Sequence, residues 1–158
     1  MAGRRSAGIL LYRRSGGEVE VLLGHMGGPF WQRKDAGAWS VPKGEYGPDE
    51  RPEAAARREF QEELGMPVPG GDLLQLVELG TVRQSGGKIV TVWAAEGDLD
   101  PADVVPGTFL LEWPKGSGRM REFPEVDRVA WLGMDEARDK LIAGQRVFLE
   151  RLAELLGG

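Results

Sequence analysis

GEYGPDERPEAAARREFQEELGM, residues 44–66, begins as a loop and continues as a helix. Its first half is rich in glycine and proline, which favour loops, and Asp49 or Glu50 can supply the oxygen that caps the helix. Pro52 is compatible with a first helical turn, and the residues that follow are mainly Ala, Arg, Glu and Leu. A glycine and a proline after the last leucine end the pattern, so the stretch predicts a helix over residues 52–64.

Three glutamates of this helix share one face, because Glu59, Glu62 and Glu63 stand at positions i, i+3 and i+4. Beside them runs an apolar stripe that can dock the helix on a core, formed by Ala56, Phe60 and Leu64. Carboxylates this close repel one another, and a hard divalent cation such as Mg²⁺ or Mn²⁺ removes that cost. The alternative is a solvated acidic face, which is the more common explanation for an isolated pair of glutamates.

The spacing across residues 44–66 favours the metal site. In order, the stretch holds Gly44, Glu50, the tripeptide Arg58-Glu59-Phe60, the pair Glu62-Glu63 and the pair Gly65-Met66, separated by five, seven, one and one residues. With a usage of about 6% per residue type, a chance match is on the order of one in 10⁸ to 10⁹ per start position. The chain therefore resembles the Nudix hydrolase superfamily of MutT-like proteins, and we refer to residues 44–66 as the Nudix box. Phe60 is bulkier than the aliphatic residue more usual at its position.

The resemblance implies roles for residues of the box. Glu59, Glu62 and Glu63 would be ligands of Mg²⁺ or Mn²⁺, with the Gly44 carbonyl as a candidate fourth ligand. Arg58 would hold these glutamates in place by charge pairing. It would complete the catalytic set with Glu62 and Glu63, and Glu63 would act through its bound water.

Two further glutamates have expected roles. Glu50 would support the junction between loop and helix. The family often recruits another glutamate from a distant loop, and Glu125, six residues before Trp131, is our candidate catalytic residue because its setting is similar to that in the diadenosine tetraphosphate hydrolases. Glu122 is the competitor, and a surface position at the start of a strand is the alternative explanation for Glu125.

Aromatic and basic residues outside the helix are candidates for substrate binding. The loop after the second predicted strand carries Trp31, which can stack on a base, and Arg33, which can hold phosphate. Lys43 lies next to the expected metal site, and Arg119 lies in a loop near Glu125. The alternative is that the aromatic side chain covers an edge of the core and that the cations balance an acidic chain.

The remaining tryptophans and the single histidine have less defined roles. Trp113 is a second candidate for base stacking, whereas Trp39, Trp93 and Trp131 are expected in the core. A structural role is favoured for His25, because lone histidines are more often structural than catalytic.

Composition limits the class of protein. The 158 residues are 41% apolar and 28% charged, which fits one packed domain over residues 1–158. The lack of cysteine excludes disulfides, thiolate metal sites and cysteine nucleophiles, and the net charge of −5 argues against a duplex nucleic-acid binder. The apolar run 8–12 is too short for a membrane span or a signal-peptide core, so we expect a cytoplasmic protein, monomeric or homodimeric.

The hydrophobic patterns predict an α/β fold. Strands are expected at 6–14, 18–24, 38–42, 72–84, 88–96, 108–113 and 126–132, helices at 52–64, 134–142 and 144–156, and a loop at 114–125. This order predicts a mixed sheet with the 52–64 helix on one face and the C-terminal helices on the other. The family resemblance implies the same architecture, an α/β/α sandwich.

The expected function is divalent-metal-dependent hydrolysis of a phosphoanhydride bond in a nucleoside polyphosphate or a dinucleoside polyphosphate. Hydrolysis of nucleotide sugars or of non-nucleotide diphosphates is an alternative, as is a nucleotide-sensing module without turnover. The intact box glutamates favour the enzyme over the sensing module. Residues 79–84 lack the proline typical of the ADP-ribose group, and no tyrosine follows Tyr46, so the markers of two subfamilies are absent.

Overall fold

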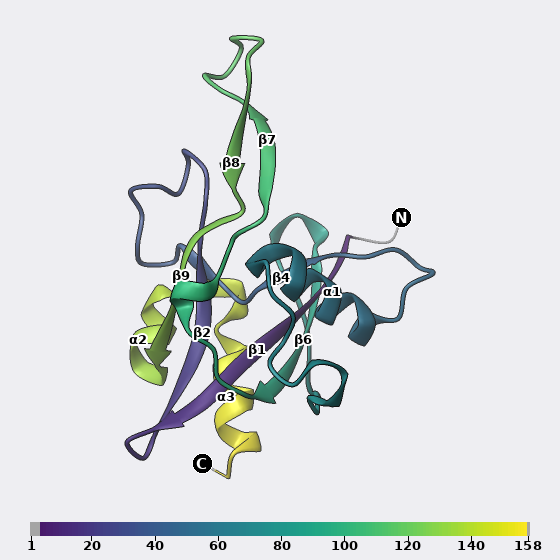
Figure 1. The fold of residues 1–158 in the computed structure, drawn as a ribbon, viewed down its shortest axis with the longest axis vertical. Coiled ribbons are helices and arrows are strands. Elements are labelled where there is room, and N and C mark those ends of the chain that lie inside the picture. Colours follow the sequence, from purple (N-terminus) through teal and green to yellow (C-terminus); the bar gives the residue numbers. More distant parts are fainter. Residues whose placement is uncertain (1–3, 158) are drawn as a thin grey trace.

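The computed structural model describes residues 4–157, and Figure 1 shows how their elements are arranged. The strands are β1 (Arg5–Ser15), β2 (Glu18–Met26), β3 (Trp39–Ser40), β4 (Lys43–Glu45), β5 (Val77–Arg83), β6 (Ile89–Glu96), β7 (Thr108–Glu112), β8 (Met120–Pro124) and β9 (Val126–Gly133). The helices are α1 (Pro52–Leu64), α2 (Met134–Lys140) and α3 (Val147–Leu155), joined by the 3₁₀ turns η1 (Gly71–Leu73), η2 (Ser85–Gly87), η3 (Pro101–Asp103) and η4 (Ala143–Gln145). Within residues 4–157, no helix has the length and apolar character that crossing a bilayer requires.

The main sheet is mixed, as predicted. Its strands follow the order β3-β2-β1-β6-β5, with β4 paired to β1 and β9 paired to β2. β1 runs parallel to β6 and antiparallel to β2 and β4. The continuous apolar run in β1 is explained by burial on both faces, because Ile9 and Leu10 belong to the two different core clusters.

Helices cover both faces of this sheet. α1 packs on the face of Ile9 through the predicted stripe, since Ala56, Phe60 and Leu64 are fully buried. The opposite face, that of Leu10, is covered by the C-terminal segment, whose buried side chains include Phe148, Leu149 and Leu152. The α/β/α arrangement expected from the sequence is therefore confirmed (Figure 1).

Three local expectations are wrong. The strand expected at 72–84 begins only at Val77, because the chain first turns through η1. α1 has Arg51 as its N-cap residue and no side-chain cap, since the carboxylate of Glu50 is held by Arg58 instead. The helix expected at 144–156 begins with the η4 turn, and α3 follows it.

The segment 114–125, expected to be a loop, contains strand β8. It pairs antiparallel with β7 in a two-stranded sheet separate from the main one, and the hairpin projects from one end of the molecule (Figure 1). The glycines that concealed this strand in the sequence lie in the turn. There the Glu112 carboxylate accepts hydrogen bonds from the N–H groups of Gly116 at 2.9 Å and Gly118 at 3.2 Å. The hairpin thus has an ordered tip rather than a free loop.

Candidate active site

Close packing between α1 and β4 places the first parts of the Nudix box together. The Glu59 carboxylate lies directly against the backbone of Gly44, so that a Cβ at this position would overlap the carboxylate oxygen atoms. Only glycine permits such an approach of a side chain to the main chain. The Glu59 side chain is consequently only 12% exposed, and this burial raises its pKa against the lowering effect of Arg58.

Arg58 holds three carboxylates, and two of them, Glu59 and Glu62, are among those that the family resemblance implies; Glu63 instead accepts from the Lys43 N–H. The Nε and Nη2 atoms of Arg58 donate to the two oxygens of Glu50 at 2.7 and 2.8 Å, a bidentate pair that joins the loop to the helix. Its Nη1 atom donates to Glu59 at 2.7 Å and to Glu62 at 3.1 Å. These bonds, first those to Glu50, raise the pKa of Arg58 and keep the guanidinium charged. One cation therefore orders a face that holds more negative than positive charge.

Glu63 is the buried carboxylate of the box. It is 7% exposed, and its Oε2 accepts a hydrogen bond from the backbone N–H of Lys43 at 3.1 Å. Burial raises the pKa of Glu63 to about 8, although the Lys43 N–H and the Lys43 ammonium both act to lower it. Burial also lowers the pKa of Lys43. A carboxylate in this position ionises readily only when further positive charge is supplied.

A cavity of about 350 Å³ opens in front of these groups, and we call it the acidic pocket. It is lined by Arg4, Ser6, Lys43, Gly44, Glu45, Glu59, Glu62, Lys88 and Glu125. The structure thus brings predicted residues from three parts of the chain to one pocket. Glu63 does not line the pocket itself but is hydrogen-bonded to the backbone of Lys43, which does. Desolvation, and then the charges of Glu59 and Glu62, raise the pKa of Glu125.

The position of Glu125 is fixed through its backbone. Its carbonyl accepts a hydrogen bond from the N–H of Gly27 at 2.9 Å, and its own N–H donates to the carbonyl of Gly107 at 2.8 Å. The competitor, Glu122, lies on the hairpin strand β8 and does not line the acidic pocket. Of the two, Glu125 is the one placed to act with the box.

Sequence reasoning missed several residues of the acidic pocket. Arg4 and Lys88 reach it because β1 and β6 are parallel neighbours, with Arg5 opposite Ile89. Ser6 and Glu45 reach it because β4 pairs with the start of β1. These pairings join distant segments, and no local pattern of the sequence indicates them.

The donor set of the acidic pocket suits a hard divalent cation, because carboxylate and carbonyl oxygens are the ligands that Mg²⁺ and Mn²⁺ prefer. Within residues 4–157, no three acidic or histidine side chains stand close enough together to hold a metal ion as they are. Glu59 and Glu62 turn toward Arg58, and Glu63 turns toward Lys43. The predicted glutamates share a face and border one pocket, but their side chains must rotate to act as a common ligand set.

Three predicted substrate-binding residues lie outside the acidic pocket. Trp31 packs against the core on the α3 side, and its ring centroid lies 5.3 Å from the Lys34 ammonium. Arg33 is exposed on the same loop. Arg119 lies at the tip of the hairpin, where its carbonyl accepts a hydrogen bond from the N–H of Trp113. Lys43 is the predicted cation that does line the acidic pocket.

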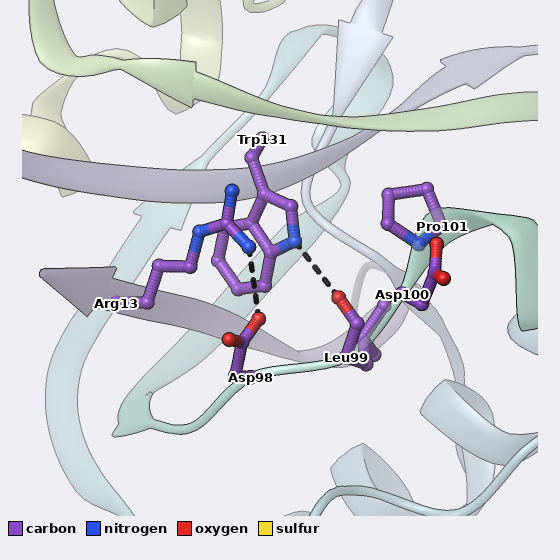
Figure 2. A pocket seen from close by; sticks show the side chains of 6 residues that line it. All are labelled: Arg13, Asp98, Leu99, Asp100, Pro101 and Trp131. Carbon is purple, nitrogen blue, oxygen red and sulfur yellow. Dashed lines mark hydrogen bonds and ion pairs between the residues drawn. The ribbon is translucent and has the colours of Figure 1, made fainter. Parts of the chain in front are cut away.

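A larger cavity, of about 580 Å³, lies elsewhere and is shown in Figure 2. We call it the Arg13 hollow; it is lined by Arg13, Asp98, Leu99, Asp100, Pro101 and Trp131. The Arg13 guanidinium stacks 4.3 Å from the Trp131 ring centroid and donates to Asp98 at 2.9 Å. The Trp131 indole N–H donates to the Leu99 carbonyl at 3.0 Å. Arg13 and Asp98 are thus already paired with each other, and no residue of the box lines this hollow.

The α/β/α fold with an acidic helix face at a pocket is that of a Nudix domain. The family model described as NUDIX domain matches residues 2–152, and the chain belongs to the Nudix family. No curated protein matches the chain.

Solved structures share this fold at low sequence identity. An Ap4A hydrolase from C. elegans in a binary complex superposes with a TM-score of 0.70 at 23% identity, covering 98% of both chains. A Nudix hydrolase from M. smegmatis, RenU, gives 0.63 at 26% identity, covering 99% of this chain and 86% of that one. The NUDIX domain of Shewanella oneidensis NrtR, complexed with ADP ribose, gives 0.65 at 18% identity, covering 99% and 90%.

Proposed function

We propose that the chain is a divalent-metal-dependent pyrophosphohydrolase that cleaves a phosphoanhydride bond in a nucleoside polyphosphate or a dinucleoside polyphosphate. The observation that carries the proposal is the buried carboxylate of Glu63 behind a pocket already lined by Glu59, Glu62 and Glu125. Buried charge of one sign is costly unless a counter-ion joins it. Mg²⁺ or Mn²⁺ together with a phosphate chain would supply that charge.

The residues of the chain fit separate tasks in this reaction. Glu59, Glu62 and Glu63, with the Gly44 carbonyl, would hold the cation. A divalent ion bound there neutralises phosphate oxygens and makes a water molecule acidic enough to attack phosphorus. Arg58 orders Glu59 and Glu62 and stays charged throughout.

Proton transfer and phosphate binding fall to residues on the rim of the acidic pocket. Glu125 has a raised pKa and a fixed backbone, which suit a group that accepts a proton from the attacking water. Lys43 and the cations Arg4 and Lys88 border the same pocket and can pair with the oxygens of a phosphate chain. These cations add to the charge that one metal ion supplies, which favours a substrate with several phosphates.

A second candidate is suggested by one of the structural neighbours. The NrtR domain is complexed with ADP ribose, so a nucleotide sugar or a nucleotide-sensing role is the alternative for this chain. The glutamates of the box are all present in this chain, which favours turnover over sensing.

A substrate panel separates these candidates. Purified protein is incubated with Mg²⁺ or Mn²⁺ and with nucleoside triphosphates, dinucleoside polyphosphates, nucleotide sugars and non-nucleotide diphosphates. Products are identified by chromatography, and isotopically labelled water shows which phosphorus receives the new oxygen. We expect turnover of polyphosphate substrates that a chelator abolishes. Turnover confined to nucleotide sugars or non-nucleotide diphosphates contradicts the substrate class, and chelator-resistant hydrolysis contradicts the role of the metal.

The panel includes two variants of α1 as a matched pair. Glu63→Gln removes the buried charge, whereas Glu53→Gln makes the same change at an exposed position in the first turn of the helix. The first variant should lose turnover of every substrate and the second should keep it. Binding of nucleotides without hydrolysis by the wild-type protein would support the sensing role instead.

A further inference from the structure

A second pocket lies beside the acidic pocket, between the β7–β8 hairpin and the loop 27–37. This hairpin pocket has a volume of about 320 Å³ and is lined by Gly28, Gln32, Arg121, Phe123, Pro124 and Asp127. The loop meets the base of the hairpin closely, because a Cβ at Gly28 would lie 3.1 Å from the ring of Phe109. Both segments rise from the same end of the molecule in Figure 1.

The walls of the hairpin pocket are held together at their outer ends as well. Phe30 of the loop packs edge-to-face on Trp113 of the hairpin, with ring centroids 5.5 Å apart. Trp113, a candidate for base stacking from the sequence, thus packs on Phe30 in this structure. An aromatic pair of this kind contributes beyond the area that it buries and ties two surface segments into one wall.

The two pockets are neighbours along the chain. Pro124 lines the hairpin pocket and Glu125 lines the acidic pocket, so their Cα atoms are about 3.8 Å apart. The hydrogen bond from the Gly27 N–H to the Glu125 carbonyl fixes this junction to the loop. The linings of the two pockets therefore adjoin at this point of the chain.

Phe123 provides a flat apolar surface in the hairpin pocket. It is half-buried, its ring lies 6.2 Å from that of Phe109, and the Arg121 guanidinium lies 5.5 Å from its centroid. Stacking on an aromatic side chain with a nearby cation is a common way for proteins to hold a nucleobase.

Asp127 provides a directed acceptor. Its Oδ1 atom contacts Nδ1 of His25 at 2.8 Å and accepts from Nη1 of Arg128 at 3.3 Å. His25 is fully buried, and its other nitrogen, Nε2, donates to the carbonyl of Lys34. The imidazole is therefore fixed, and it in turn holds the Asp127 carboxylate in place. Among the contacts of residues 4–157, Oδ2 of Asp127 makes no hydrogen bond, and this side chain borders the hairpin pocket at 26% exposure.

We propose that the hairpin pocket is the nucleobase subsite of the enzyme and that Asp127 selects a base with an exocyclic amino group, as in adenine or cytosine. The inference rests on the proposed function, since it assigns the nucleoside end of that substrate. Adenine and cytosine present an amino donor where hypoxanthine and uracil present an oxo acceptor. A carboxylate oxygen accepts a hydrogen bond from the amino group and repels the oxo group. Gln32, whose amide both donates and accepts, completes the edge contact.

Paired substrates that differ only in this group test the proposal. The wild-type enzyme should hydrolyse ATP with a kcat/KM about tenfold or more above that for ITP, and CTP above UTP, which is the discrimination expected from one good base contact. Asp127→Ala should lower kcat/KM for ATP and raise the value for ITP, so that the ratio of the two falls to about one. A purely structural role of Asp127 would lower both values equally, and that result overturns the proposal. Asp72→Ala, an exposed aspartate in η1, is the matched control.

A second variant covers the case in which Asp127→Ala fails to fold, because that change leaves His25 without its partner. Phe123→Leu keeps an apolar side chain but loses the stacking surface. It should raise KM for ATP by about tenfold, the loss expected for one stacked base. The KM for inorganic tripolyphosphate, which has no base, should not change. Equal changes for both substrates, or none for either, exclude Phe123 from base binding.

A binding measurement keeps this inference distinct from the proposed function. AMP and IMP are titrated into wild-type protein without metal, and tryptophan fluorescence or NMR shifts report binding. If no nucleotide is hydrolysed but AMP binds more tightly than IMP through Asp127, the proposed function fails and the subsite stands. If polyphosphates are hydrolysed without regard to the base, and AMP and IMP bind equally, the subsite fails and the hydrolase stands.

Discussion

The acidic pocket and the Arg13 hollow both combine an arginine with carboxylates, but they differ in how the charges are balanced. In the hollow, Arg13 pairs with Asp98 at 2.9 Å (Figure 2). It also pairs with Glu20 at 2.9 Å, and the Asp98 side chain is 69% exposed. Beside the acidic pocket, Arg58 forms ion pairs with three carboxylates. Glu63, on the same helix, is buried, with 7% of its surface exposed. The buried carboxylate, Glu63, therefore lies beside the smaller cavity, whereas Asp98 of the larger cavity is exposed.

This difference shows why cavity size does not locate the site of chemistry in this molecule. Exposed pairs such as those of Arg13 lose little water and contribute on the order of 1 kcal/mol or less to stability. A buried carboxylate without a full partner is costly to the fold and is retained where it has a task, and the task that we propose here is the binding of a cation. Three experiments probe this contrast, from the largest expected effect to the smallest.

Replacing the buried charge should have the largest effect. Glu63→Gln keeps the shape of the side chain and its bond to Lys43, but it removes the negative charge that a hard cation needs. We expect kcat to fall on the order of a hundredfold or more, while the far-UV spectrum stays native. Asp98→Asn in the Arg13 hollow makes an equivalent change at an exposed, paired carboxylate and should leave kcat as it is. Similar losses in both variants would remove the distinction between the two cavities.

The pH dependence of stability should reveal the same buried group. Because the pKa of Glu63 is about 8 in the folded protein and near its ordinary lower value in the unfolded chain, the folded state holds its proton more tightly. The contribution of Glu63 to the free energy of unfolding is therefore fully present at acidic pH and is lost as the pH rises toward 8. Added Mg²⁺ must displace that proton. Its apparent affinity should therefore increase by about tenfold for each unit by which the pH rises, up to about pH 7.

Thermal unfolding between pH 5 and 8.5, with and without Mg²⁺, measures both trends. The melting temperature of metal-free wild-type protein should fall over this range more than that of Glu63→Gln, which has no proton to lose. The increase caused by Mg²⁺ should grow with pH in the wild type and be small in the variant. A metal effect of constant size across the range would show that Glu63 is not the group that the cation titrates.

Changing the two arginines should give the smallest and most selective effect. Arg58→Lys keeps the charge but loses the bidentate bond to Glu50 and the separate bonds to Glu59 and Glu62, because an ammonium lacks the planar fork of a guanidinium. We expect a loss of about tenfold in kcat/KM, or 1.4 kcal/mol, from misplaced carboxylates. Arg13→Lys should leave kcat/KM unchanged and shift the free energy of unfolding by less than about 1 kcal/mol. Equal kinetic losses would mean that both arginines act through overall stability.

Local sequence was sufficient for the helix and its acidic face. The bounds of α1 were predicted correctly, because helix propensity, the proline at its start and the glycine after its end act over a few neighbouring residues. The spacing of Glu59, Glu62 and Glu63 follows from the period of the helix and needs no knowledge of the fold. The same spacing indicated the family, which the match over residues 2–152 confirms.

Strand pairing was the weaker part of the prediction. The segment 114–125 was expected to be a loop because its glycines and prolines are turn formers, yet β8 forms there. Its partner, β7, was expected as a strand, but no pattern within either segment states that the two pair with each other. The energy of a β-strand comes largely from the neighbour across the ladder, which local propensity does not contain.

The sequence by itself determined the α/β/α fold, the acidic helix and the family, since each depends on short-range periodicity and spacing. The tertiary structure decided which distant residues meet. It placed Glu125 and Lys43 at the box, left Trp31 and Arg33 outside the acidic pocket, and joined His25 to Asp127 across 102 positions of chain. It also decided that Glu63 is buried while Glu62 of the same helix face is exposed. Burial and charge balance depend on everything that packs around a group, so they emerge only when the whole chain has folded.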